Sequence, residues 1–115
     1  SRLQEAYYSD VMPNLQRCVI ETDGNPVGRW YRNDEEGLIN LVDVAVLPAF
    51  QQQGIARVLM NGLLAEARRN ARVVSLHVEQ GNAARAWYTR LGFVETGEHG
   101  VYVKMQFDPA TAPIG

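Results

Sequence analysis

The segment Phe50–Arg57 reads Phe-Gln-Gln-Gln-Gly-Ile-Ala-Arg and leads into a stretch with helical spacing of apolar residues. At a helix N-terminus the first backbone N–H groups have no intrahelical partner and the helix dipole is positive, so a diphosphate can bind to the main chain there. The small residues Gly54 and Ala56 leave room for an anion to reach those amides. The spacing therefore indicates an anion cradle, and the alternative is that Gly54 only begins a helix.

Two other phosphate-binding loops do not fit this segment. A nucleotide-hydrolysing P-loop needs Lys and then Ser or Thr directly after its last glycine, and a Rossmann turn needs Gly-x-Gly-x-x-Gly. Gly54 is followed by Ile-Ala-Arg, and it is not part of a Rossmann glycine pattern. Both classes of nucleotide-binding loop are therefore excluded at this position.

The elements that must position the cradle follow from hydrophobic periodicity. Apolar, β-branched runs predict strands, and apolar residues three and four apart predict helices. The expected strands are residues 17–22, 27–32, 38–47, 72–79, 93–96 and 101–107, and the expected helices are residues 2 to 8 or 12, 54–70 and 83–91. Residues 23–26 and 33–37 are expected turns, and residues 108–115 a tail. The strand-helix-strand order from 38 to 79 requires a parallel, right-handed crossover if the two strands are neighbours, which predicts an α/β (α+β) fold with a mixed sheet.

Composition narrows the class of protein. The chain has 115 residues, 46% of them apolar and 21% charged, as expected for one soluble globular domain. Its net charge of -2 and lack of basic runs argue against nucleic acid and anionic membranes as partners. No apolar stretch approaches the roughly 18 residues of a membrane span and no signal peptide is visible, so a cytoplasmic location is expected. The lone cysteine, Cys18, is expected to be buried, and no metal site is expected because no Cys/His cluster has ligand spacing.

Two ordered blocks resemble a known family. Residues 42–57, Val-Asp-Val-Ala-Val-Leu-Pro-Ala-Phe-Gln-Gln-Gln-Gly-Ile-Ala-Arg, resemble the acetyl-CoA-binding core of the GNAT superfamily of N-acetyltransferases. Gln51, Gly54 and Ala56 fill its signature Gln/Arg-x-x-Gly-x-Gly/Ala, which follows a strand ending in Val-x-Pro. The second block, Asn82–Phe93, is similar to the family's Asn-x-x-Ala…Tyr-x-x-x-Gly-Phe segment. The resemblance covers residues 17–107.

The resemblance implies a mostly antiparallel sheet with a central, splayed parallel strand pair and flanking helices. Pantetheine would extend the sheet in the slot between the splayed strands, along the main chain of one strand, and backbone amides after that strand would hold the diphosphate. Asn82 would hydrogen-bond the cofactor, and it also suits the cap of the following helix. The cofactor-binding residues expected on this basis are Val44, Ala45, Val46, Gln51, Gln52, Gln53, Gly54, Ile55, Ala56, Arg57 and Asn82.

Acetyl transfer to an amine needs a group that takes the amine proton and one that protonates the departing thiolate. Tyr88 matches the family tyrosine that serves as general acid, and the alternative is a tyrosine packed in the core. Asp43, which interrupts an apolar strand where family members often carry an acidic residue, is one candidate base. His77 on the next strand is a second, because an ordinary histidine pKa near 6.5 suits base chemistry. Glu79, two residues on and on the same face, is a third.

The expected function is therefore N-acetyl transfer from acetyl-CoA, as co-substrate, to a primary amine by direct attack in a ternary complex. The acceptor is a small molecule, peptide or protein, and the oligomeric state stays open, a homodimer included. The alternative function is a non-catalytic acyl-CoA-binding or regulatory module. The 115 residues are expected to form a single domain that lacks the first strand and helix of the family, because the first hairpin follows a single predicted helix.

Overall fold

The computed structural model describes residues 14–46 and 54–113, with the backbone alone at residue 22 and at residues 43–46. The helix expected within residues 2–12 and the positions Gln51, Gln52 and Gln53 lie outside the described residues.

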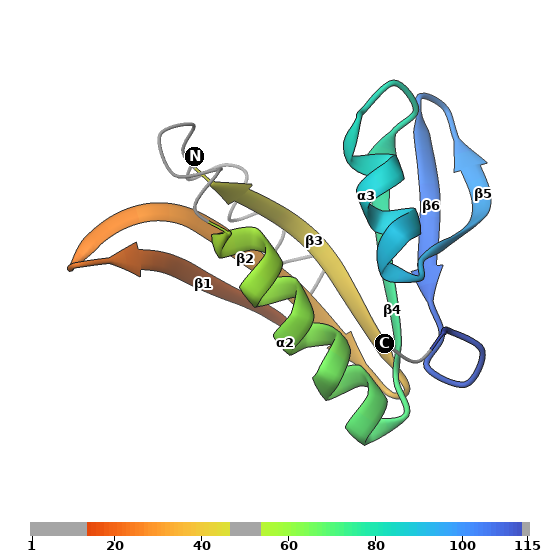
Figure 1. Ribbon diagram of the computed structural model, residues 1–115, viewed down its shortest axis with the longest axis horizontal. Coiled ribbons are helices and arrows are strands. Elements are labelled where there is room, and N and C mark those ends of the chain that lie inside the picture. Colours follow the sequence, from red (N-terminus) through yellow and green to blue (C-terminus); the bar gives the residue numbers. More distant parts are fainter. Residues whose placement is uncertain (1–13, 47–53, 114–115) are drawn as a thin grey trace.

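The described chain folds into one six-stranded sheet with two helices (Figure 1). The strand order is β1-β2-β3-β4-β6-β5, in which β3 and β4 are parallel and all other neighbours are antiparallel. The elements are β1 (Leu15–Thr22), β2 (Asn25–Glu35), β3 (Leu38–Val46), α2 (Ile55–Asn70), β4 (Val73–Glu79), α3 (Ala84–Leu91), β5 (Val94–His99) and β6 (Tyr102–Phe107). The predicted mixed, mostly antiparallel sheet with one central parallel pair is confirmed. Neither described helix is long and apolar enough to cross a membrane.

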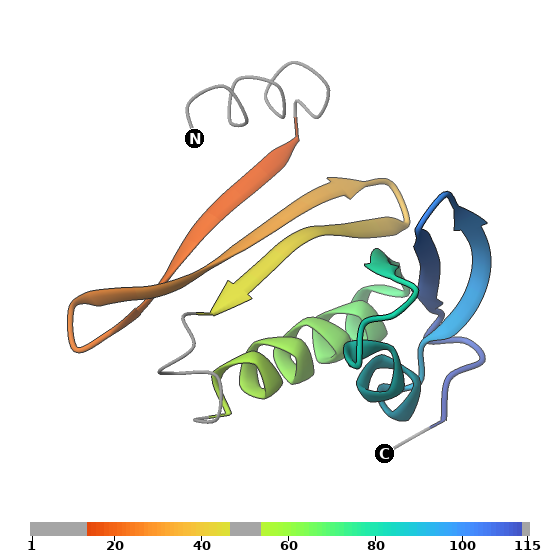
Figure 2. The ribbon, with the colours of Figure 1, turned by 90° about the horizontal axis from the view of Figure 1, so that it is seen from above.

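The parallel pair is short, and the two strands then diverge. Residues 38–41 of β3 pair with residues 73–76 of β4, ending at the pair Leu41 and Leu76. Arg32 of β2 is opposite Leu41 while Tyr31 is opposite Asp43, so Val42 is an extra residue in β3 at this point. Such a bulge bends its strand and increases its twist. Figures 1 and 2 show the result: β3 and β4 lie together at one end and separate toward the other.

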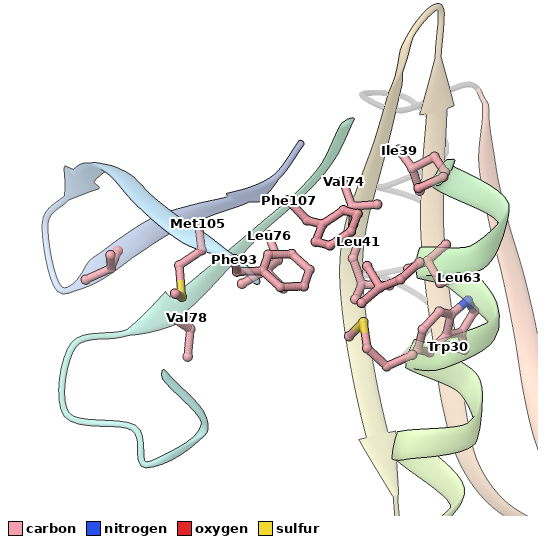
Figure 3. Close-up of a cluster of buried hydrophobic side chains, with 14 residues drawn as sticks. Trp30, Ile39, Leu41, Leu63, Val74, Leu76, Val78, Phe93, Met105 and Phe107 are labelled. Carbon is pink, nitrogen blue, oxygen red and sulfur yellow. The ribbon is translucent and has the colours of Figure 1, made fainter. Parts of the chain in front are cut away.

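The core lies between the helices and one face of the sheet. Helix α2 buries residues three or four apart, Met60, Leu63, Leu64 and Ala67, as expected for an amphipathic helix. They pack against strand residues whose side chains point toward α2 at every second position. Of these strand residues, Ile39, Val74, Met105 and Phe107 are fully buried. Burial of each large apolar side chain stabilises the fold by roughly 1.5–3 kcal/mol. Figure 3 shows this cluster continuing from Trp30 and Leu63 to Val78 and Met105, so the core joins both halves of the splayed sheet.

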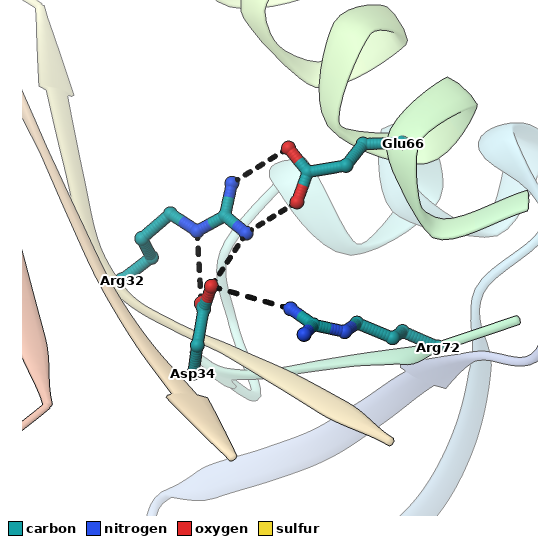
Figure 4. Close-up of polar contacts among 4 residues, drawn as sticks. All are labelled: Arg32, Asp34, Glu66 and Arg72. Carbon is teal, nitrogen blue, oxygen red and sulfur yellow. Dashed lines mark hydrogen bonds and ion pairs between the residues drawn. The ribbon is translucent and has the colours of Figure 1, made fainter. Parts of the chain in front are cut away.

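An ionic network holds α2 onto β2 (Figure 4). The Arg32 guanidinium lies 2.5 Å from Glu66 of α2 and 2.9 Å from Asp34 of its own strand. Arg72, at the start of the chain's return into β4, reaches Asp34 at 3.4 Å. The hydrogen bond from Arg32 lowers the pKa of Glu66, and the two carboxylates together raise the pKa of Arg32. This network fixes the C-terminal half of α2 and thereby the direction in which its N-terminus points.

Some predicted boundaries and one burial prediction are wrong in the structure. The predicted turn at residues 23–26 ends too late, because β2 begins at Asn25, and the predicted strand 93–96 ends too early, because β5 continues to His99. The predicted turn at residues 33–37 begins too early, because β2 continues through Glu35. Asn33 and Asp34 fit a strand because they alternate: Asp34 is neutralised by Arg32 and Arg72, while the Asn33 residue is buried. Cys18 is exposed, not buried. Its strand β1 is the outer strand of the described sheet, next to β2 alone, so one side of it stays open.

Candidate active site

A cavity of about 220 Å³ lies where β3 and β4 separate. We call it the slot. Its walls come from the divergent part of both strands, from the start of α3 and from β6, and they bring together residues that the sequence places far apart. The lining residues are Leu41, Val42, Leu76, His77, Val78, Glu79, Asn82, Ala84, Tyr88 and Tyr102. The slot thus contains Tyr88 and His77, predicted as acid and base, together with Asn82 and the third candidate base, Glu79.

A second cavity, of about 240 Å³, is lined by Asn40, Leu41, Val42, Ser75 and His77. It shares Leu41, Val42 and His77 with the slot. Ser75 and His77 alternate along β4 with the core residues Leu76 and Val78, so they face away from α2. The hydroxyl of Ser75, which is buried, hydrogen-bonds Asn40 Oδ1 across the parallel pair. His77 therefore borders both cavities.

The slot-side edge of β3 has no described strand beside it beyond Leu41. Val44, Ala45 and Val46 pair through their other edge with Trp30, Arg29 and Gly28 of β2. Among the strands that the structure describes, none pairs with β3 on the β4 side after residue 41. Backbone N–H and C=O groups at such an edge are available to an extended partner. The geometry therefore fits the main-chain role expected of Val44–Val46, which stays a prediction.

Helix α2 begins directly after Gly54, beyond the end of β3. Gly54 has φ +76°, in the left-handed region that favours glycine, and its carbonyl accepts the Val58 N–H at 3.0 Å. Among the residues that the structure describes, no side chain caps this helix, and no acidic residue stands in its first turn. A Cβ built on Gly54 would meet no described atom within 4 Å. The helix start thus keeps uncapped amides, free space and a conformation that glycine supplies.

Tyr88 lies on α3 with its ring half-buried beside the slot. Its ring centroid is 5.3 Å from that of Trp87 and 5.6 Å from that of Phe93, and the Phe93 contact is edge-on. Burial raises the pKa of the Tyr88 phenol, so the hydroxyl keeps its proton at neutral pH. Packing against the core and a role as general acid are compatible at this position, because the Tyr88 ring packs against the core and the residue also lines the slot.

Asn82 caps helix α3, which is the alternative role predicted for it from the sequence. Its Oδ1 accepts the Ala84 N–H at 2.8 Å and so caps the first turn of α3. The residue also lines the slot. Because the side-chain oxygen serves the helix, the amide NH₂ is the end of Asn82 that suits a ligand.

The candidate bases differ in what surrounds them. The His77 ring is exposed at the border of the two cavities, and desolvation, His99 and Lys104 lower its pKa. At neutral pH His77 is therefore mainly uncharged and can accept a proton. Glu79 lines the slot two residues further along β4. The backbone of Asp43 lies opposite Tyr31 just after the bulge, and its side chain is outside the described residues.

Two features of this site were not found by reading the sequence. The first is the bulge at Val42, which alternation does not reveal because the adjacent Leu41 and Val42 are both apolar. The second is His99, whose ring lies against His77 with centroids 5.9 Å apart at an interplanar angle of 69°. The only sequence signal for this pair is that the chain contains two histidines.

The chain belongs to the GNAT acetyltransferases. Residues 13–95 match the family model described as acetyltransferase (GNAT) domain, which is well over half of the chain. A splayed parallel pair, a free strand edge and an uncapped helix start are the features of this fold that the structure displays. No curated protein matches the sequence.

Solved structures with the same fold include N-acetyltransferases, two of which are named for different acceptors. The PaiA N-acetyltransferase from Thermoplasma acidophilum, solved with coenzyme A, has a TM-score of 0.73 at 16% identity over 93% of this chain and 69% of that one. A ribosomal-protein alanine N-acetyltransferase from Escherichia coli has a TM-score of 0.76 at 21% identity, covering 96% and 79%. A chimera of the Vibrio cholerae spermidine N-acetyltransferase SpeG has a TM-score of 0.71 at 24% identity, covering 95% and 79%. At these identities the likeness concerns the fold.

Proposed function

We propose that this protein transfers the acetyl group of acetyl-CoA to a primary amine by direct attack in a ternary complex. The observation that carries the proposal is the slot, in which a protonated phenol and an uncharged imidazole line one cavity beside a free strand edge. Membership of the GNAT acetyltransferases supports acetyl transfer as the reaction class. That similar folds are solved with coenzyme A supports the co-substrate.

The cofactor-binding residues are distributed along the route from the helix start to the slot. The first amides of α2, at Ile55, Ala56 and Arg57 after Gly54, would hold the diphosphate. The main chain of Val44–Val46 would hydrogen-bond pantetheine as an added strand, and the Asn82 amide would contact it from the opposite wall. Gln51, Gln52 and Gln53 keep the anion-binding role expected from the motif.

The chemistry requires two proton transfers. The base removes one proton from the acceptor nitrogen as that nitrogen attacks the thioester carbonyl, and His77 suits this role because it is mainly uncharged at neutral pH. The C–S bond then breaks, and Tyr88 gives its proton to the departing thiolate. Asp43 and Glu79 remain the alternative bases, and Glu79 also lines the slot. Since no step uses a protein nucleophile, the exposed Cys18 is not needed.

The acceptor class is a primary amine of a small molecule, peptide or protein. Named activities of similar folds include one on a ribosomal-protein alanine and one on spermidine, and both are amines. A non-catalytic acyl-CoA-binding module is the second candidate, and it would keep the helix start and the free strand edge without using Tyr88 and His77.

The test combines binding and turnover. Isothermal titration of acetyl-CoA into the folded chain should give saturable binding, and a panel of primary amines should then release CoA thiol in an amine-dependent way. Absence of binding at high micromolar acetyl-CoA by protein that circular dichroism shows to be folded would contradict both functions. Binding without amine-dependent thiol would instead identify the non-catalytic module.

A further inference from the structure

The sheet face turned away from α3 carries a pair of histidines. On β4, His77 and Glu79 point to this face, because they alternate with the core residues Leu76 and Val78. The register places Lys104 of β6 beside His77, and Tyr102 of β6 beside Glu79. His77 and Glu79 also line the slot, so charged side chains on this face influence the electrostatic potential in the slot.

The second histidine comes from the next strand. His99 of β5 is opposite Tyr102, and Gly97 is opposite Lys104. His77 and His99 therefore lie diagonally on either side of β6, and their rings meet in an edge-on contact with centroids 5.9 Å apart. Gly97 has no side chain, and a Cβ at that residue would meet nothing within 4 Å, so this position of β5 adds no side chain beside Lys104.

The charges around His77 make the pair asymmetric. Lys104 and His99 act on it as positive charges from β6 and β5, and Glu79 is the carboxylate on the same face of β4. Tyr102 of β6 and Tyr88 of α3 are the other titratable side chains described at the slot. Positive charges on both rings at this separation repel each other, so a charge on His99 disfavours a charge on His77.

We propose that His99 is a positioning residue: its ring, held edge-on against His77 by the register of β5 on β6, disfavours a positive charge on His77 and so keeps the ring at the slot able to accept the acceptor's proton. The inference rests on the proposed function for the use of His77, but the coupling of the two rings is a property of the folded chain alone. When both rings are uncharged, His77 is also a free base, so the pairing matters most on the acid side of neutrality. Burial of part of His77 and the charge of Lys104 act in the same direction.

The pair predicts opposite effects for two substitutions at one position. His99→Gln removes a positive charge, so the protonation midpoint of His77 moves to higher pH. His99→Lys leaves a permanent positive charge beside the ring, so the midpoint moves to lower pH. In both variants His77 is the one histidine left, which makes its NMR signal unambiguous. Arg69→Gln, which removes an exposed positive charge at the end of α2, is the matched control and should leave the midpoint unchanged.

The experiment is an NMR pH titration of His77 in these three variants and the parent chain, followed by the pH profile of kcat/KM. Midpoints that move up in His99→Gln and down in His99→Lys support the coupling. Midpoints that stay in place, or move the same way in both variants, overturn it. The acid limb of kcat/KM should move with the midpoint, lowering the activity of His99→Gln at pH 6 relative to pH 8 by about twofold.

The two parts of the inference fail in different ways. If the midpoints move as expected and the acid limb does not follow, the coupling stands and His77 is overturned as the base. If the chain binds acetyl-CoA but shows no turnover, the proposed function fails while the titration still decides the pairing. Since His99 is exposed, circular dichroism of both variants should match that of the parent chain.

Discussion

At the scale of residues, the environment of the slot shifts the pKa values of Tyr88 and His77 in opposite directions. Burial raises the pKa of Tyr88, and desolvation with nearby positive charge lowers the pKa of His77. Both displacements favour the uncharged form, because a partly dry cavity penalises charge on an acid and on a base alike. The consequence is one group with a proton to give and one with a lone pair to accept a proton, at the same pH.

Replacement of the Tyr88 hydroxyl tests the acid. Tyr88→Phe should keep the ring contacts with Trp87 and Phe93, so stability changes little, while turnover falls by about 100-fold because the thiolate departs without a proton donor. Steady-state kinetics and acetyl-CoA titration measure kcat and Kd separately. Tyr102→Phe, at a tyrosine that also lines the slot, is the control and should retain turnover. Unchanged kcat in Tyr88→Phe would remove Tyr88 as the acid.

At the scale of elements, α2 is held at one end by side chains and presents main chain at the other. The network of Arg32, Asp34, Glu66 and Arg72 fixes its C-terminal half, and Gly54 opens its N-terminus. A rigid helix aimed by such contacts can present its first amides in one direction. Two predictions separate these roles.

The Glu66 carboxylate should contribute to stability in a pH-dependent way. Its pKa in the folded chain lies below the ordinary value near 4.5, so its contribution is present above that pH and is lost as the pH falls through the lowered folded value. Glu66→Gln should therefore lower the free energy of unfolding by about 1 kcal/mol at pH 7. Urea denaturation at pH 7 and pH 3 checks this, and the difference from the parent chain should shrink at the lower pH. Glu98→Gln, at an exposed carboxylate, is the control; an equal effect there would contradict a specific role for Glu66.

The Gly54 position can be tested against a second glycine with the same backbone constraint. Gly54 has φ +76° and Gly24, in the β1–β2 turn, has φ +81°, and neither Cβ position has a described atom within 4 Å. Gly54→Val and Gly24→Val should thus each cost about 1–2 kcal/mol of stability through left-handed backbone strain. Only Gly54→Val should weaken acetyl-CoA binding, by about tenfold or more, because its side chain stands before the first amides of α2. Calorimetric titration and thermal melting of both variants measure the two effects. Equal loss of binding in both would attribute it to destabilisation alone.

At the scale of the whole molecule, the sheet consists of two three-stranded halves. One half is β1-β2-β3 and the other is β4-β6-β5, joined by the short parallel pairing of residues 38–41 with residues 73–76. The apolar core under α2 connects the same halves on one face (Figure 3). The site forms where this junction ends, so it belongs to neither half alone.

Much of this architecture follows from local patterns in the sequence. The strand-helix-strand order predicted the parallel pair, and a helical spacing that includes Leu63 and Ala67 predicted α2 and part of the face that it buries. Within the candidate site, the sequence motifs identified Gly54, Asn82 and Tyr88 as candidate residues. The rest depends on contacts between distant residues: the long β2 requires Arg72 near Asp34, and the histidine pair requires the register of β5 on β6. Neither of these long-range contacts can be predicted from hydrophobic periodicity.

The bulge at Val42 has a mechanical consequence. It directly follows Leu41, the last described residue of β3 that pairs with β4, so the slot begins where the bulge bends β3 away from β4. The pair Leu38 and Val73, at the joined end of the two strands, lines neither cavity. Substitutions at that pair would therefore change the slot through the angle between the two strands and not through a lining side chain.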